Sequence, residues 1–179
     1  MLKLPHIRSI SKISVIVIGL LVFLVIMIGF WPKSEKNITQ EVESINLAIR
    51  RHYQKQADFR GLNTETVVRE SLAPAFMIRQ NKIFSRMNRE IFIGRDEQGH
   101  TCLPTDQFFA LTYLNLDKNM CKNLISQPFD ISLGLREITL SNDQSSQTFS
   151  YGGDLSLPIT PEVAEKHCQT LNTVVLVFE

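Results

Sequence analysis

Residues 13–31 form an uninterrupted apolar stretch, and this stretch restricts the fold of the chain more than any other feature. No charged residue lies between Lys12 and Lys33, and the stretch consists mainly of Ile, Val, Leu, Phe and Met. A helix of this length would be roughly 28 Å long, which is close to the thickness of a bilayer's hydrocarbon core. Because lipid cannot hydrogen-bond the backbone, such a segment must be helical. The sequence therefore predicts one membrane-spanning helix over residues 13–31.

The charges that flank this stretch predict its orientation. Three basic residues and no acidic residue precede it, namely Lys3, Arg8 and Lys12. The positive-inside rule then places residues 1–12 in the cytoplasm and the rest of the chain outside. A secretory signal peptide is the competing interpretation, but its apolar region is usually about 7 to 15 residues long and ends in small residues. Because this stretch is longer and ends in Trp31 and Pro32, we expect an uncleaved anchor.

A second helical pattern follows, and it is amphipathic. Pro32 can end or kink the first helix. Apolar residues then recur at helical spacing and form a packing stripe, which consists of Ile38, Val42, Ile45, Ile49 and Tyr53. The charged residues Glu41, Glu43, Arg50 and Arg51 are expected to fall outside this stripe. We predict that residues 32–53 form the outer half of one long helix, whose stripe packs on the remaining chain.

The remaining residues, 54–179, predict one globular domain of the α+β class. Short helices are expected over residues 64–72, 120–125 and 161–168, the last with a strong start signal at Thr160, Pro161 and Glu162. Strands are expected over residues 91–93, 108–114, 131–140 and 173–178, and a polar loop over residues 141–150. We expect an antiparallel sheet packed on the amphipathic helix.

Three cysteines follow the apolar stretch, at positions 102, 121 and 168. In an oxidising compartment, two of the three are expected to pair. A bond between Cys121 and Cys168 would join two of the short helices and stabilise the domain by about 4 kcal/mol in the chain-entropy account. Cys102 would then be left over, either buried and inert or bonded to another chain.

No pattern in the sequence indicates catalysis, a metal site or a cofactor. His100 and His167 lie close to cysteines, but their spacing matches no zinc motif and no nucleophile signature surrounds them. The motifs of phosphate loops, zinc proteases and serine hydrolases are missing. A net charge of +1 argues against a nucleic-acid surface, and the basic stretch 79–95 is interpreted as solvated surface. We therefore expect no enzyme, no cofactor, no metal, no small-molecule substrate and no nucleic-acid partner.

Six short segments follow one another in a consistent order, and they are residues 49–53, 59–66, 73–77, 109–124, 159–168 and 173–178. Together they resemble the type IVb pilins, the group of the bundle-forming pilin and of plasmid-encoded conjugative pilins. The resemblance implies a pilin-like fold in which Cys121 and Cys168 form the family's disulfide. It also implies a structural protein of the bacterial inner membrane with a periplasmic domain. Its partners would be other pilin-like subunits or the machinery of a type IV pilus, secretion or conjugation system.

The beginning of the chain departs from that family. The family's leader ends in Gly and its mature apolar segment has a Glu near its start, whereas no Gly precedes residue 13 and no acid occurs in residues 1–34. The resemblance implies that this Glu pairs with a neighbour's amine in an apolar core, where an unpaired charge is costly. We therefore expect an unprocessed minor or accessory subunit. The alternatives are a single-span envelope protein whose outer domain is an unrelated binding module, and a membrane-tethered periplasmic enzyme.

Overall fold

The computed structural model describes residues 38–129 and 131–179 of the chain. The predicted cytoplasmic segment 1–12, the predicted span 13–31 and the first residues of the predicted amphipathic half lie outside the described residues. Within the described part, no helix combines the length and the apolar character that crossing a bilayer requires.

The first described element is the amphipathic helix α2, Ile38–Tyr53. All five residues of the packing stripe are buried, with side chains at most 6% exposed. Glu41 and Asn46 are buried as well, so the covered face is wider than the stripe. The expectation that Glu41 lies outside the covered face is therefore wrong. Its position explains this, because Glu41 follows Ile38 by three residues and precedes Ile45 by four, and both spacings bring side chains to one face of a helix.

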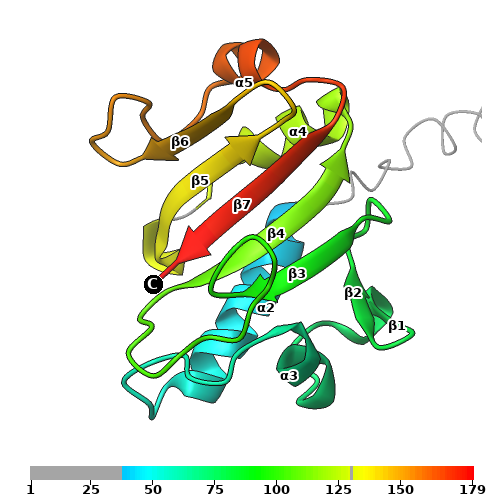
Figure 1. Cartoon of the computed structure of the whole chain (residues 1–179), viewed down its shortest axis with the longest axis vertical. Helices are drawn as coiled ribbons and strands as arrows, with labels where there is room; N and C mark the ends of the chain where they lie inside the picture. The colour runs from blue at the N-terminus through cyan, green and yellow to red at the C-terminus, as the bar shows by residue number, and fades with distance from the viewer. Residues whose placement is uncertain (1–37, 130) are drawn as a thin grey trace, which may run out of the picture. The chain divides into compact units, whose positions relative to one another are not determined.

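A seven-stranded antiparallel sheet forms the second layer, with the strand order β1-β2-β3-β4-β7-β5-β6. The strands are β1 Ile78–Arg79, β2 Lys82–Phe84, β3 Glu90–Gly94, β4 Phe109–Leu116, β5 Leu135–Ser141, β6 Ser146–Ser150 and β7 Asn172–Phe178. The last strand of the chain, β7, pairs with both β4 and β5 and so lies inside the sheet (Figure 1). Leu111, Leu176 and Ile138 lie side by side across these three strands and belong to the buried core.

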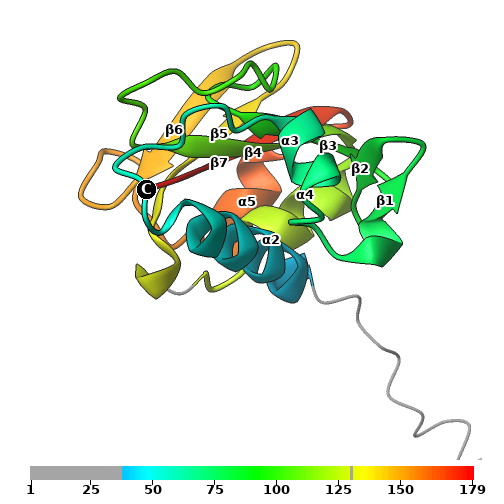
Figure 2. The same cartoon turned by 90° about the horizontal axis from the view of Figure 1, so that it is seen from below.

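Short helices complete the domain. They are α3 Thr64–Arg69, η1 Ala75–Met77, α4 Lys118–Ile125, η2 Ile131–Leu133 and α5 Pro161–His167. Figure 2 shows α2, α4 and α5 on the same face of the sheet. The core lies between this helical layer and the sheet. The fold is α+β, as the sequence predicted.

The second half of the sheet differs from the prediction at two points. The expected strand over residues 131–140 begins only at Leu135, because η2 and Gly134, with φ of +70°, occupy the preceding positions. The expected loop over residues 141–150 contains β6. Hydroxyl pairs replace apolar contacts on the exposed face of this strand, at Thr139 with Thr148 and at Ser141 with Ser146, each at 2.9 Å. A pattern based on apolar residues does not detect such a strand.

Candidate functional site

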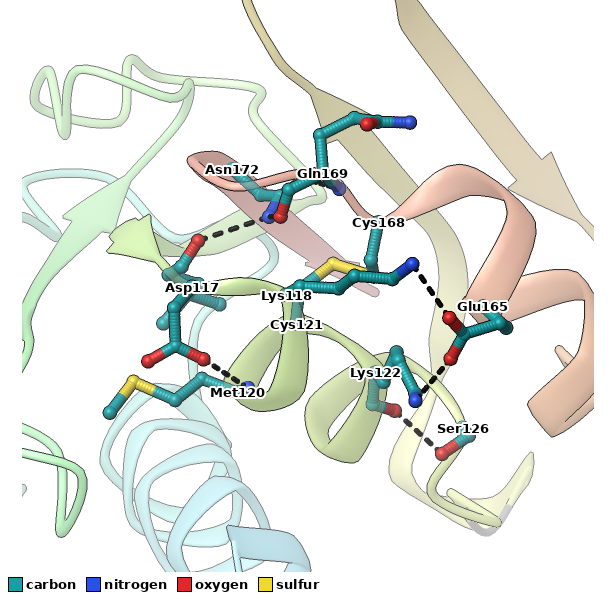
Figure 3. Close-up of a disulfide and its surroundings, with 11 residues drawn as sticks. Asp117, Lys118, Met120, Cys121, Lys122, Ser126, Glu165, Cys168, Gln169 and Asn172 are labelled. Carbon is teal, nitrogen blue, oxygen red and sulfur yellow. Dashed lines mark hydrogen bonds and ion pairs between the residues drawn. A yellow bond between two sulfur atoms is a disulfide. The ribbon is translucent and has the colours of Figure 1, made fainter.

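The disulfide between Cys121 and Cys168 joins α4 to the end of α5 (Figure 3). Local sequence positions both sulfur atoms. The Asp117 side chain accepts a hydrogen bond from the backbone N–H of Met120 at 2.9 Å and so caps α4, which then buries Cys121 together with Leu124. On α5, Cys168 follows the buried Ala164 by one helical turn. The predicted pairing of Cys121 with Cys168 is confirmed, with the Cα atoms 5.9 Å apart.

A polar bridge lies beside the disulfide on the outside of the same two helices. Lys118 and Lys122 on α4 both form ion pairs with Glu165 on α5, and the Lys118 Nζ lies 2.6 Å from the Glu165 Oε1 (Figure 3). The hydrogen bonds from the two ammonium groups lower the pKa of Glu165 to about 2. Because Glu165 lies at the surface, water and salt screen these pairs, so they contribute little to the stability of the domain.

The segment between Cys168 and β7 is fixed by one side chain. The Asn172 amide N–H groups donate to the backbone oxygens of Leu116 and Gln169 at 3.0 and 2.7 Å, and its oxygen accepts from the Gln169 N–H at 2.8 Å. Asn172 is buried, whereas the adjacent Leu171 is 50% exposed. The disulfide, the ion pairs and Asn172 thus connect α4, α5 and the start of β7, with the ion pairs on the outside of this region.

A second group of polar residues lies where α2 meets the sheet, and the sequence analysis missed it. Glu41 is 2% exposed. One of its carboxylate oxygens accepts from the backbone N–H of Arg86 at 2.8 Å, and the other accepts from the Tyr113 hydroxyl at 3.3 Å. Burial raises the pKa of Glu41, and burial also raises the pKa of Tyr113, which therefore remains a neutral donor. This arrangement joins the first turn of α2 to the β2–β3 connection.

The side chains of His100, Cys102 and His167 do not lie together. His100 lies at the surface, 2.8 Å from Asp96, and the His167 ring contacts Phe149. Cys102 is a free, buried thiol, and burial raises its pKa to about 12. Among the residues that the structure describes, no group of three or more His, Cys, Asp and Glu side chains is placed to hold a metal ion. The sequence left two alternatives open for Cys102, and in the structure this residue is a buried thiol.

A pocket with a volume of about 590 Å³ lies at the ends of β4 and β5, beside the segment before β7. Its lining includes Phe92, Leu114 and Leu171 together with amides and the carboxylates of Glu97 and Asp143.

Comparisons with known proteins agree on the kind of fold. The model of the Bundlin family matches residues 32–174. The chain is similar to the type IV b pilin from Salmonella typhi, with 16% identity and a TM-score of 0.50 over 76% of this chain and 96% of that chain. It is also similar to TcpA, a type IV pilin from Vibrio cholerae El Tor biotype, with 14% identity and a TM-score of 0.51 over 80% of this chain and 97% of that chain. At these levels of identity, the two structures show similarity of fold only. No curated protein matches the sequence.

Proposed function

Because this chain belongs to the Bundlin family of type IVb pilins, whose members are structural pilus subunits and not enzymes, we propose that it is an accessory subunit of a type IV pilus, secretion or conjugation apparatus. One observation carries the proposal. The family match over residues 32–174 covers α2, the sheet as far as Val174 in β7 and both cysteines of the disulfide, so it includes nearly all of the described domain.

We further propose that residues 13–31 anchor the subunit in the inner membrane, with residues 1–12 in the cytoplasm and the domain in the periplasm. The uncharged stretch and the basic residues before it support this arrangement. The bond between Cys121 and Cys168 supports it independently, because structural disulfides form and persist in oxidising compartments such as the periplasm.

The proposed accessory role rests on the lack of acidic residues in the segment 1–34. No carboxylate occurs in residues 1–34, so the apolar segment has no acid that could pair with the amine of a neighbouring subunit. The apolar segment would pack laterally on other helices, and the surface of α4 and α5 would contact a partner subunit or the assembly machinery.

Crosslinking in living cells tests the role of this surface. A photo-crosslinking residue at Asn119, exposed on α4, is expected to capture a pilus or secretion component, whereas the same residue at Gln144, in the exposed β5–β6 turn, serves as the matched control. Capture of a single partner from outside any such apparatus would favour the alternative of an envelope binding module.

Processing is tested separately. We expect the mass of the chain's N-terminal peptide to be the same in cells with and without the prepilin peptidase. A decrease in mass that depends on the peptidase would contradict the accessory role and favour a processed pilin.

A further inference from the structure

The first turn of α2 lies beside a surface that carries four basic residues and one exposed aromatic ring. This surface, called the basic surface below, consists of Phe76, Arg79, Lys82, Arg86 and Arg89. It extends from η1 along β1 and β2 to the start of β3. In Figure 2 these elements lie toward the end of α2 at which the described chain begins.

The hydrogen bond from the Arg86 backbone N–H to the Glu41 carboxylate fixes this position. Glu41 belongs to the first turn of α2, and the donor–acceptor distance is 2.8 Å. On the other side of the same turn, the Thr39 hydroxyl donates to the Gln127 side-chain oxygen at 2.8 Å. The basic surface is therefore held at one end of the domain by contacts that do not depend on exposed side chains.

The composition of the basic surface favours an anionic, partly apolar partner. Residues 74–90 contain four cations and one acid, Glu90, which pairs with Lys82 at 2.9 Å. The Arg86 guanidinium lies over the Phe76 ring, 4.7 Å from its centroid, and Phe76 is 51% exposed. A cation beside an exposed aromatic ring suits the boundary between lipid headgroups and hydrocarbon, where one part of the pair meets phosphate and the other meets apolar surface.

The chain before α2 limits how far this end of the domain can be from a membrane. Residues 32–37 separate the apolar stretch from Ile38. Six residues span at most about 20 Å when fully extended. If residues 13–31 cross the bilayer, as the proposed function holds, the N-terminal end of α2 must stay near the membrane surface, and the basic surface stays with it.

We propose that the basic surface rests on the anionic phospholipid headgroups of the membrane in which the chain is anchored. The inference depends on the anchoring part of the proposed function. Docking of this kind would restrict the orientation of the domain before assembly. The sequence alone indicates a solvated basic face, whereas the structure places Arg86 of this face beside the first turn of α2.

Hydrogen exchange of the full chain in lipid nanodiscs tests the proposal. The wild-type chain is reconstituted in discs of phosphatidylcholine alone or mixed with phosphatidylglycerol. Exchange within residues 74–90 is expected to be slower in the anionic discs, and added salt is expected to abolish the difference. Each Lys or Arg near an anionic surface strengthens docking about fivefold, so R79Q/K82Q should weaken it about 25-fold.

The matched control is K55Q/R60Q. This variant also removes one exposed lysine and one exposed arginine, but from the segment that follows the other end of α2, about 24 Å along a helix of 16 residues. It is expected to retain the protection that anionic lipid gives to residues 74–90. Circular dichroism and the oxidised disulfide check that each variant is folded.

Three results would overturn the proposal. The first is a chain that enters the discs but shows the same exchange in both lipids, which leaves the anchor intact. The second is protection that persists in R79Q/K82Q or that grows with the number of chains per disc, because the partner would then be a second copy. The third is failure of the full chain to enter the bilayer, which would overturn the proposed anchoring as well.

Discussion

Burial and ionisation oppose each other at Glu41. Burial raises the pKa of this carboxyl above its ordinary value of 4.5, so the folded state binds the proton more tightly than the unfolded state. The contribution of Glu41 to stability is therefore most favourable below pH 4.5 and weakens as the pH rises through the raised pKa. An uncharged side chain that keeps both hydrogen bonds would not show this loss.

Glu41→Gln tests this balance. The Gln amide can accept from the Arg86 N–H through its oxygen and donate to the Tyr113 oxygen through its nitrogen. We expect the difference in unfolding free energy between the variant and the wild type to shift in favour of the variant as the pH rises from acidic to neutral.

Glu41→Ala should instead destabilise the domain by about 1–3 kcal/mol, because two buried donors lose their acceptor. Urea unfolding at several pH values measures both, with Glu43→Ala as a half-exposed control. A difference for Glu41→Gln that does not change with pH would contradict the assignment.

Cys102 offers a second prediction for a single residue. With a pKa of about 12, its thiol is almost entirely protonated at neutral pH, and only roughly one molecule in 10⁵ carries the reactive thiolate. We expect alkylation of the native chain to be far slower than alkylation of the chain in denaturant. Mass spectrometry after timed exposure to iodoacetamide measures the two rates. Rapid labelling of the folded chain at Cys102 would show that the thiol is accessible and would restore the alternative of a bond to another chain.

At the scale of elements, the disulfide decides how firmly α4 and α5 are joined. The bond closes a loop over a sequence separation of 47 residues. We expect C121S/C168S to lower the free energy of unfolding by about 4 kcal/mol in the chain-entropy account, or less if the unfolded chain keeps structure. Glu165→Gln is the matched control on the same helix pair, and it should change stability little because the ion pairs of Glu165 are exposed. Equal stability of the double variant and the wild type in denaturant unfolding would contradict the prediction.

The elements that sequence patterns predicted are those whose residues act locally. The spacing of Ile38, Val42, Ile45 and Ile49 is sufficient to predict a helix, and Thr160 followed by Pro161 is sufficient to predict where α5 begins. The run of β-branched and apolar residues from 173 to 178 likewise predicted an inner strand. In each case the physical cause lies within one helix or one strand.

The elements that were missed depend on contacts between distant parts of the chain. β6 is polar and is held by pairing with β5, and β1 and β2 are too short to show a periodic pattern. Glu41 is buried because Arg86 and Tyr113, far along the chain, supply its hydrogen bonds. A single charged residue in an amphipathic helix carries no sign of such partners. The disulfide could be anticipated because the resemblance to the type IVb pilins implies a bond between Cys121 and Cys168, whereas nothing in the sequence indicated the buried carboxylate.

For the whole molecule, the state of the disulfide reports on the side of the membrane at which the domain lies. If residues 1–12 lie in the cytoplasm, the domain lies in the periplasm, and Cys121 and Cys168 are expected to be oxidised in cells. Replacing Lys3, Arg8 and Lys12 with Gln removes the cations that favour this orientation. We therefore expect a fraction of the variant chains to insert the other way round, with the domain in the cytoplasm and both thiols reduced.

Alkylation in intact cells, followed by mass spectrometry of the peptides that contain Cys121 and Cys168, measures the oxidised fraction. A variant in which Lys55, Arg60 and Lys166 are replaced with Gln has lost the same charge from the domain itself and should remain fully oxidised. Cys102 does not disturb the measurement, because it is buried and its thiol is unpaired in the folded domain. A wild-type chain with reduced cysteines would place the domain in the cytoplasm. In that case the direction of the anchor and the proposed periplasmic contacts of α4 and α5 would have to be revised together, because both depend on the orientation of the single apolar segment.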